Sequence, residues 1–105
     1  MLHTSFQTRL LAEQVQVRFP SMDWRRALTI ARFYYDPQRK PVNARGAHSD
    51  SQADFIGRLV AAHVRHNMTE YERLYQMGYD KVTAREVVRP VVGRILAEFR
   101  KEKVI

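Results

Sequence analysis

Residues 56–66 read IGRLVAAHVRH, and this stretch decides the fold because its apolar residues recur with the period of an α-helix. A helix turns once every 3.6 residues, so Ile56, Leu59 and Val60 share one face, and His63 falls on the same face. We expect this face to be buried. The pattern therefore predicts a helix over residues 51–67 with His63 inside the core, hydrogen-bonded because an unpaired buried imidazole is costly.

Helical periodicity continues on both sides of this stretch, and no segment alternates with period two for long enough to predict a strand. Cap-forming residues predict helix starts at Thr4, Ser21, Thr69 and Thr83, and Gly78 is expected to end the fourth helix. The second helix is expected to bury Trp24, Ala27, Leu28, Ala31, Tyr34 and Tyr35. The last helix contains Pro90, where we expect a kink.

The predicted fold is all-α: a single compact domain over residues 1–105, with about five helices and a long basic loop between the second and third helices. That loop covers residues 36–50, whose prolines, glycine, asparagine and serines disfavour regular structure. With 45% hydrophobic residues the chain can bury a small core, and the absence of cysteine excludes disulfides and thiolate metal sites. No apolar run approaches the roughly 20 residues of a membrane span. The amino terminus lacks the order of a secretory signal, so we expect a cytoplasmic protein with no membrane partner.

The charge of the chain favours a phosphate-bearing partner. The net charge is +7, and residues 18–48 carry seven basic residues against two acidic ones, which is +5 of that total. Fourteen of the 18 basic residues are arginine, whose planar guanidinium suits phosphates and base edges. A GC-rich genome, which prefers arginine codons, explains the same bias equally well.

Arginines at a spacing of seven predict where nucleic acid would bind. Such a pair lies about 10 Å apart on one side of a helix. We predict a non-enzymatic nucleic-acid-binding module, DNA or RNA, whose basic surface combines two helical pairs with the loop: Arg25, Arg32, Arg58, Arg65, Arg39, Lys40 and Arg45. Arg85 and Arg89, near the start of the last helix, also fit the second member of a helix-turn-helix.

The alternative is a protein-interaction or scaffolding module without a nucleic-acid role. It would dimerise through the first helix or through the side chains around Met68, Tyr75, Met77 and Tyr79. A large exposed apolar patch would favour this alternative. A contiguous positive surface would favour nucleic acid.

Catalysis and metal binding have weak support in the sequence. His63 and His66 are spaced to share a metal with Glu70 or Glu72, but a hydrogen-bonded core explains the same residues. No nucleophile motif or glycine-rich phosphate loop is present, so the prediction leans against an enzyme and assigns no catalytic residue, metal or cofactor. The predicted structural polar core is His63, His66, Thr69, Tyr71 and Arg85, with Arg85 pairing with Asp80 or Glu72.

Residues 19–100 resemble a family of helical domains of unknown function, number 2293. The resemblance rests on Phe19-Pro20, Ala62-His63-Val64-Arg65-His66, Thr69, Tyr71, Leu74, Gly78, Ala84-Arg85, Val88, Val92, Ile95-Leu96 and Phe99-Arg100. The family tends to have tryptophan at the position of Phe99, and a glycine-arginine-rich loop where this chain has residues 41–46. The resemblance implies a small helical fold and no activity.

Overall fold

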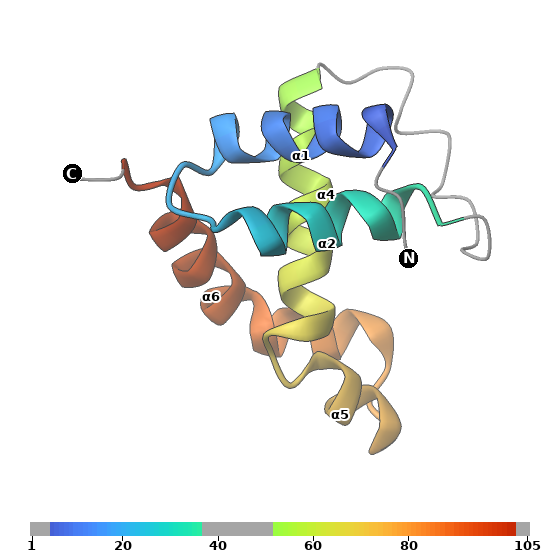
Figure 1. Ribbon diagram of the computed structural model, residues 1–105. Helices are drawn as coiled ribbons and strands as arrows, with labels where there is room; N and C mark the ends of the chain where they lie inside the picture. Colours follow the sequence, from blue (N-terminus) through green and yellow to red (C-terminus); the bar gives the residue numbers. More distant parts are fainter. Residues whose placement is uncertain (1–4, 37–51, 103–105) are drawn as a thin grey trace.

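The structure is a computed structural model that describes residues 5–36 and 52–102, and within these ranges the secondary structure is entirely helical (Figure 1). The helices are α1 (Phe6–Arg18), α2 (Trp24–Tyr34), α4 (Gln52–Asn67), α5 (Tyr71–Gln76) and α6 (Lys81–Arg100). The predicted all-α fold is confirmed. The loop residues Arg39, Lys40 and Arg45, together with Thr4, lie outside the described residues.

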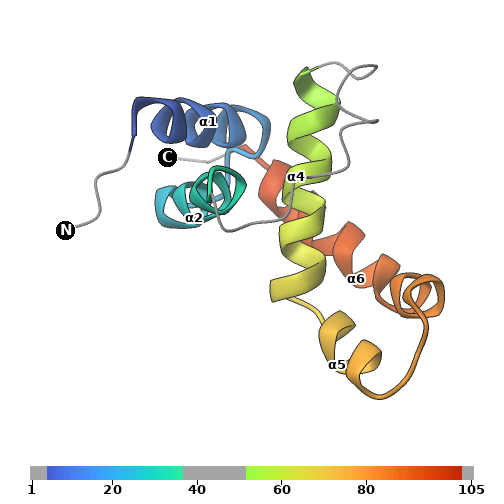
Figure 2. The same ribbon diagram turned by 90° about the vertical axis from the view of Figure 1, so that its right-hand side faces the viewer.

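The helices are arranged around α4. Helices α1 and α2 form an antiparallel pair that α4 crosses from behind (Figure 1). Seen from the side, α4 stands between this pair and the helices α5 and α6 (Figure 2). Helix α6 then returns to the corner between α1 and α2, where the Ser21 amide donates a 2.9 Å hydrogen bond to the Phe99 carbonyl. The Ser21 hydroxyl donates to the Lys101 carbonyl at the same corner.

The main core lies between α1, α2 and α4. Helix α4 contributes Ile56, Val60 and Val64, whereas the sequence predicted that the buried face would continue through Leu59 and His63. Leu59 is partly buried and His63 is half-buried. Helix α4 packs against α6 as well as against α1 and α2, so its buried face continues as far as Val64. The buried residues of this core are Leu11, Ala12, Val15, Phe19, Met22, Ala27, Ile30, Ala31, Ile56, Val60 and Val64.

The second helix buries less of its predicted face. Ala27 and Ala31 are buried as expected, with Ile30 between them, but Trp24 and Tyr35 are exposed. Trp24 is the first residue of α2, and Tyr35 follows its last residue. The prediction that they belong to the core is therefore wrong.

The helix caps differ from the predicted ones by a few residues. Ser5, Asp23 and Asp80 cap α1, α2 and α6, and each side chain accepts a hydrogen bond from the backbone amide three residues later. Ser21 and Thr83 are therefore not the caps. Helix α5 begins after Glu70 without a side-chain cap, so Thr69 does not form the predicted capping box. Gly78 follows α5 with φ +100°, which confirms its role as the left-handed residue after the helix.

Candidate functional site

The carboxyl end of α4 holds an arginine against an aromatic ring. The guanidinium carbon of Arg65 lies 5.4 Å from the centre of the Tyr71 ring, and Tyr71 is buried. The intervening turn fixes this arrangement, because the Thr69 hydroxyl donates to the Arg65 carbonyl and accepts a 3.2 Å hydrogen bond from the Tyr71 amide. A guanidinium group is attracted to the face of an aromatic ring, and its planar shape allows it to stack on the ring. The turn therefore orients Arg65.

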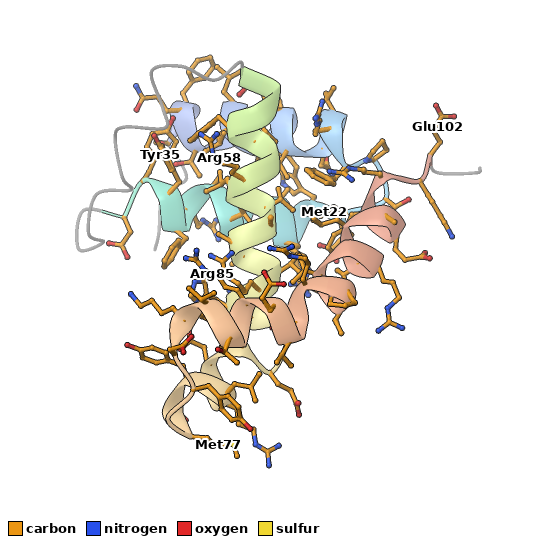
Figure 3. All side chains as sticks on the ribbon, turned by 180° about the vertical axis from the view of Figure 1, so that it is seen from behind. Met22, Tyr35, Arg58, Met77, Arg85 and Glu102 are labelled. Atoms are coloured by element: carbon orange, nitrogen blue, oxygen red, sulfur yellow. The ribbon has the colours of Figure 1, made fainter. Side chains whose placement is uncertain are left out.

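A second arginine reaches the same place from α6. Ala84 and Val88 pack with Tyr71 in a small core of their own, which sets α6 against α5. Arg85, the next residue after Ala84, lies beside α4 (Figure 3). Burial first, and then the positive charge of Arg85, lower the pKa of Arg65, while Tyr71 acts in the opposite direction. We call Arg65, Tyr71 and Arg85 the arginine cluster.

The arginine cluster has no carboxylate counterion among the described residues. The predicted partners of Arg85 are engaged elsewhere: Asp80 accepts a 2.7 Å hydrogen bond from the Thr83 amide, and Glu72 bonds to Nδ1 of His66. The predicted pairing of Arg85 with either acid is therefore wrong. In addition, the buried Nε of Arg65 has no hydrogen-bond partner within the described part of the chain. A buried donor without a partner is uncommon in folded proteins.

His66 borders the cluster at the surface. Its ring meets the Tyr71 ring edge-on, with centroids 5.1 Å apart and an interplanar angle of 89°. His66, Thr69, Tyr71 and Arg85, all assigned to the polar core by sequence, thus come together around the end of α4. Tyr71 is buried, but His66 and Arg85 are exposed, so this is a surface cluster and not a core.

His63 lies apart from these residues, on the flank of α4 that faces α2. Nη1 of Arg26 donates a 3.0 Å hydrogen bond to Nε2 of His63, since the guanidinium has no acceptor. Burial and then the charge of Arg26 lower the pKa of His63, which keeps the imidazole neutral. His63 is hydrogen-bonded but half-buried, so the expected place deep in the core is wrong. Sequence reasoning missed Arg26, although its position beside the buried Ala27 could have indicated it.

The two histidines do not form a metal site in the described ranges. His63 faces Arg26 while His66 faces Glu72, and no three histidine or acidic side chains of residues 5–36 and 52–102 gather in metal-binding geometry. The structure therefore leaves the paired-histidine ligand alternative without support in this part of the chain.

The two predicted arginine rows lie on different faces of the molecule. Arg25 and Arg32 are exposed on the side of α2 away from Ala27 and Ala31. Arg58 is exposed on the side of α4 away from the same core, two residues from the buried Ile56 and Val60. These rows therefore do not join into one surface over the described residues.

The row on α4 continues onto α6. Arg65 is half-buried, with its guanidinium over the Tyr71 ring. Arg58 and Arg85 lie on the same side of α4, so the row runs from Arg58 through Arg65 to Arg85 (Figure 3). Arg89 bonds to Glu86 at 2.7 Å, and Arg85 turns toward α4. Both side chains are exposed, so the helix-turn-helix expectation stays a prediction.

Apolar side chains are exposed where α5 turns into α6. Tyr75, Met77, Tyr79 and Val82 form this tip, and Figure 3 shows Met77 at the end of the molecule farthest from α1. Met68, which the sequence grouped with them, packs against the main core and is partly buried. No helix in the described ranges has both the length and the apolar character needed to cross a membrane.

Comparison with known proteins identifies a family. The chain belongs to the family of uncharacterized conserved proteins described as DUF2293, whose sequence model matches residues 14–100. Searches among curated proteins and among solved structures gave no match. The match includes the whole arginine cluster.

Proposed function

Since membership of this family assigns no activity, we propose from the site alone that the chain binds nucleic acid by its phosphates. The contact surface is the row of Arg58, Arg65 and Arg85 on α4 and α6. The observation that carries the proposal is the arginine cluster, in which the positive charge of Arg85 acts on the half-buried Arg65 and neither side chain has a salt bridge to a carboxylate among the described residues. Like charges held close together repel, and a bound phosphate would remove that repulsion.

The length of the row favours a polymer over a single small anion. Arg58 and Arg65 are seven residues apart, which is about 10 Å along a helix, whereas phosphates on one DNA strand recur every ~3.4 Å of helix axis. The row therefore spans more than one phosphate. The net charge of +7 adds attraction at longer range.

The remaining predicted contacts have secondary roles in this proposal. Arg25 and Arg32 lie on the other face and contribute to the general positive field, and the loop residues Arg39, Lys40 and Arg45 supply further charge. Phosphate contacts carry no sequence information, so we propose binding without sequence preference. This activity needs no catalytic group or cofactor, and we place it in the cytoplasm.

Fluorescence anisotropy with labelled single-stranded and duplex DNA and RNA tests this proposal. We expect the logarithm of affinity to fall linearly with the logarithm of salt concentration between about 50 and 200 mM. The Arg85→Gln variant removes an exposed cation, and the paired variant R58Q/R85Q removes two. Each lost phosphate contact should reduce the salt slope by about 1, roughly equally for all sequences.

The matched control is R25Q/R32Q, which removes two exposed arginines from the opposite face. It should weaken binding less than R58Q/R85Q does, although the loss of net charge is the same. Equal effects of the two pairs would reduce the proposal to bulk charge attraction. No shift of any nucleic acid by micromolar protein in about 50 mM salt would rule it out.

A second candidate function rests on the apolar tip. Tyr75, Met77, Tyr79 and Val82 are exposed together, and tyrosine and methionine are enriched in protein interfaces. The alternative is therefore a protein-interaction module that uses the α5–α6 turn. A Met77→Glu variant that binds nucleic acid normally but loses a protein partner would favour this candidate.

A further inference from the structure

Helix α1 is apolar on two opposite faces. Leu11, Ala12 and Val15 are buried in the main core, while Phe6, Leu10 and Val17 are 77%, 43% and 82% exposed. At about 100° per residue the three exposed side chains fall within about 40° of each other around the helix. They form a stripe along the whole of α1, and we call it the outer stripe.

Two opposite charges lie beside the outer stripe. Arg9 and Glu13 are exposed, one helical turn apart, and both fall on the same flank of the stripe. Within the described residues neither side chain has a salt-bridge partner. The flank therefore presents a positive charge toward the start of α1 and a negative charge toward its middle.

We propose that the outer stripe binds the outer stripe of a second copy of this chain, with the two α1 helices antiparallel about a two-fold axis. The axis would cross α1 between Leu11 and Ala12. Phe6 then lies opposite Val17 of the second copy, and the two Leu10 side chains meet near the axis. A two-fold axis perpendicular to both helices brings the same flank of each helix together, so Arg9 lies within one residue, about 1.5 Å along the helix, of the position opposite Glu13 of the second copy.

This charge arrangement selects a second copy as the occupant. An antiparallel copy of α1 automatically presents the reversed order of charges, and both ion pairs form at once. A shallow pocket of about 230 Å³ opens on the other flank, lined by Gln7, Leu10, Leu11, Gln14, Tyr34, Tyr35 and Phe55.

The expected dimer is weak, because one face of a 13-residue helix is smaller than a standard stable interface. Its dissociation constant should lie in the micromolar range or above, so the population of dimer depends on concentration. The proposal does not depend on nucleic-acid binding, since α1 carries none of Arg58, Arg65 and Arg85.

Sedimentation equilibrium of the full chain, from about 5 µM to 1 mM in low salt, tests the dimer. We expect a monomer–dimer equilibrium. The charge reversals Arg9→Glu and Glu13→Arg should each weaken dimerisation several-fold, because each places like charges opposite one another. The double variant R9E/E13R restores both ion pairs and should recover dimerisation. Val82→Glu, at the apolar tip, is the matched control and should change nothing.

Three results would overturn the proposal. A chain that stays monomeric up to 1 mM would show that the outer stripe does not bind a second copy. A dimer that Val82→Glu weakens, and that R9E leaves intact, forms through the apolar tip instead. A double variant no better than the single variants would show that Arg9 and Glu13 do not meet across the interface.

Discussion

Replacing His63 by alanine tests the contact that joins α2 to α4. The variant removes the imidazole that accepts the 3.0 Å hydrogen bond from Nη1 of Arg26. A hydrogen bond to a charged group contributes about 1.5–3 kcal/mol. Both side chains are half-buried, so water can replace part of the contact in the variant. We therefore expect His63→Ala to lower the free energy of unfolding by about 1–2 kcal/mol, including lost packing.

A double-mutant cycle isolates the hydrogen bond from the packing. The cycle compares His63→Ala, Arg26→Ala and the double variant, with the free energy of unfolding measured by urea denaturation at pH 7.5. Groups in direct contact usually show a coupling energy of about 0.5–3 kcal/mol, and this half-buried pair should fall near 1 kcal/mol. Arg25→Ala, one residue away and exposed, is the control and should show no coupling to His63.

The pH dependence follows from the same contact. The pKa of His63 is lower in the folded chain than its usual value of 6.5, because of burial and then the charge of Arg26. In the pH range between the pKa of His63 in the folded chain and its usual value, which applies to the unfolded chain, the unfolded chain binds more protons than the folded chain does. The free energy of unfolding therefore rises with pH in this range. The contribution of His63 is therefore complete above pH 6.5 and is lost as the pH falls through the folded pKa.

Comparison of the parent with His63→Ala over pH 4.5–8 measures this contribution. We expect the difference in stability between the two proteins to shrink as the pH falls. A coupling energy of zero, or a difference that grows toward acid pH, would refute the assignment of Arg26 as donor to a neutral His63.

Further predictions concern the caps, the turn after α5 and the interior of α6. Asp23→Ala removes the α2 cap and should lower the free energy of unfolding by about 1 kcal/mol, as measured by urea denaturation. Gly78→Ala should cost about 1 kcal/mol or more, because φ is +100°, and thermal unfolding would show it. Pro90→Ala restores a backbone donor and should raise stability by up to about 3 kcal/mol. Val64→Ala should lower stability by about 1–3 kcal/mol, and no change in its melting curve would contradict its place in the core.

Helix existence was predictable from the sequence, whereas the start of each helix was not. Hydrophobic periodicity identifies a buried face over many residues, so errors at single positions matter little. A cap depends on one residue, and the chain places two cap-forming residues near each helix start. Asp80 and Thr83 illustrate this, because Thr83 is also acceptable three residues inside the helix, where its amide bonds to Asp80.

The candidate site was only partly predictable for a related reason. Periodicity places Arg65 on the side of α4 away from the core, which is correct for an isolated helix. Tyr71 then packs against Arg65 on that side, and α6 packs against α4, at a place that the sequence does not indicate. The electrostatic effect of Arg85 on Arg65, which are 20 residues apart, therefore needed the structure. The turn through Thr69 to Tyr71 involves neighbours in sequence, and its residues were singled out from the start.

The hydrogen bonds from Ser21 to Phe99 and Lys101 have a consequence for how the chain folds. They join residues about 80 positions apart, so they form only after nearly the whole domain has been ordered. The last turn of α6 should then unravel and re-form independently of its first turns. Amide hydrogen exchange at Ser21 would report that local opening, and a protein fused directly after Lys101 would increase it.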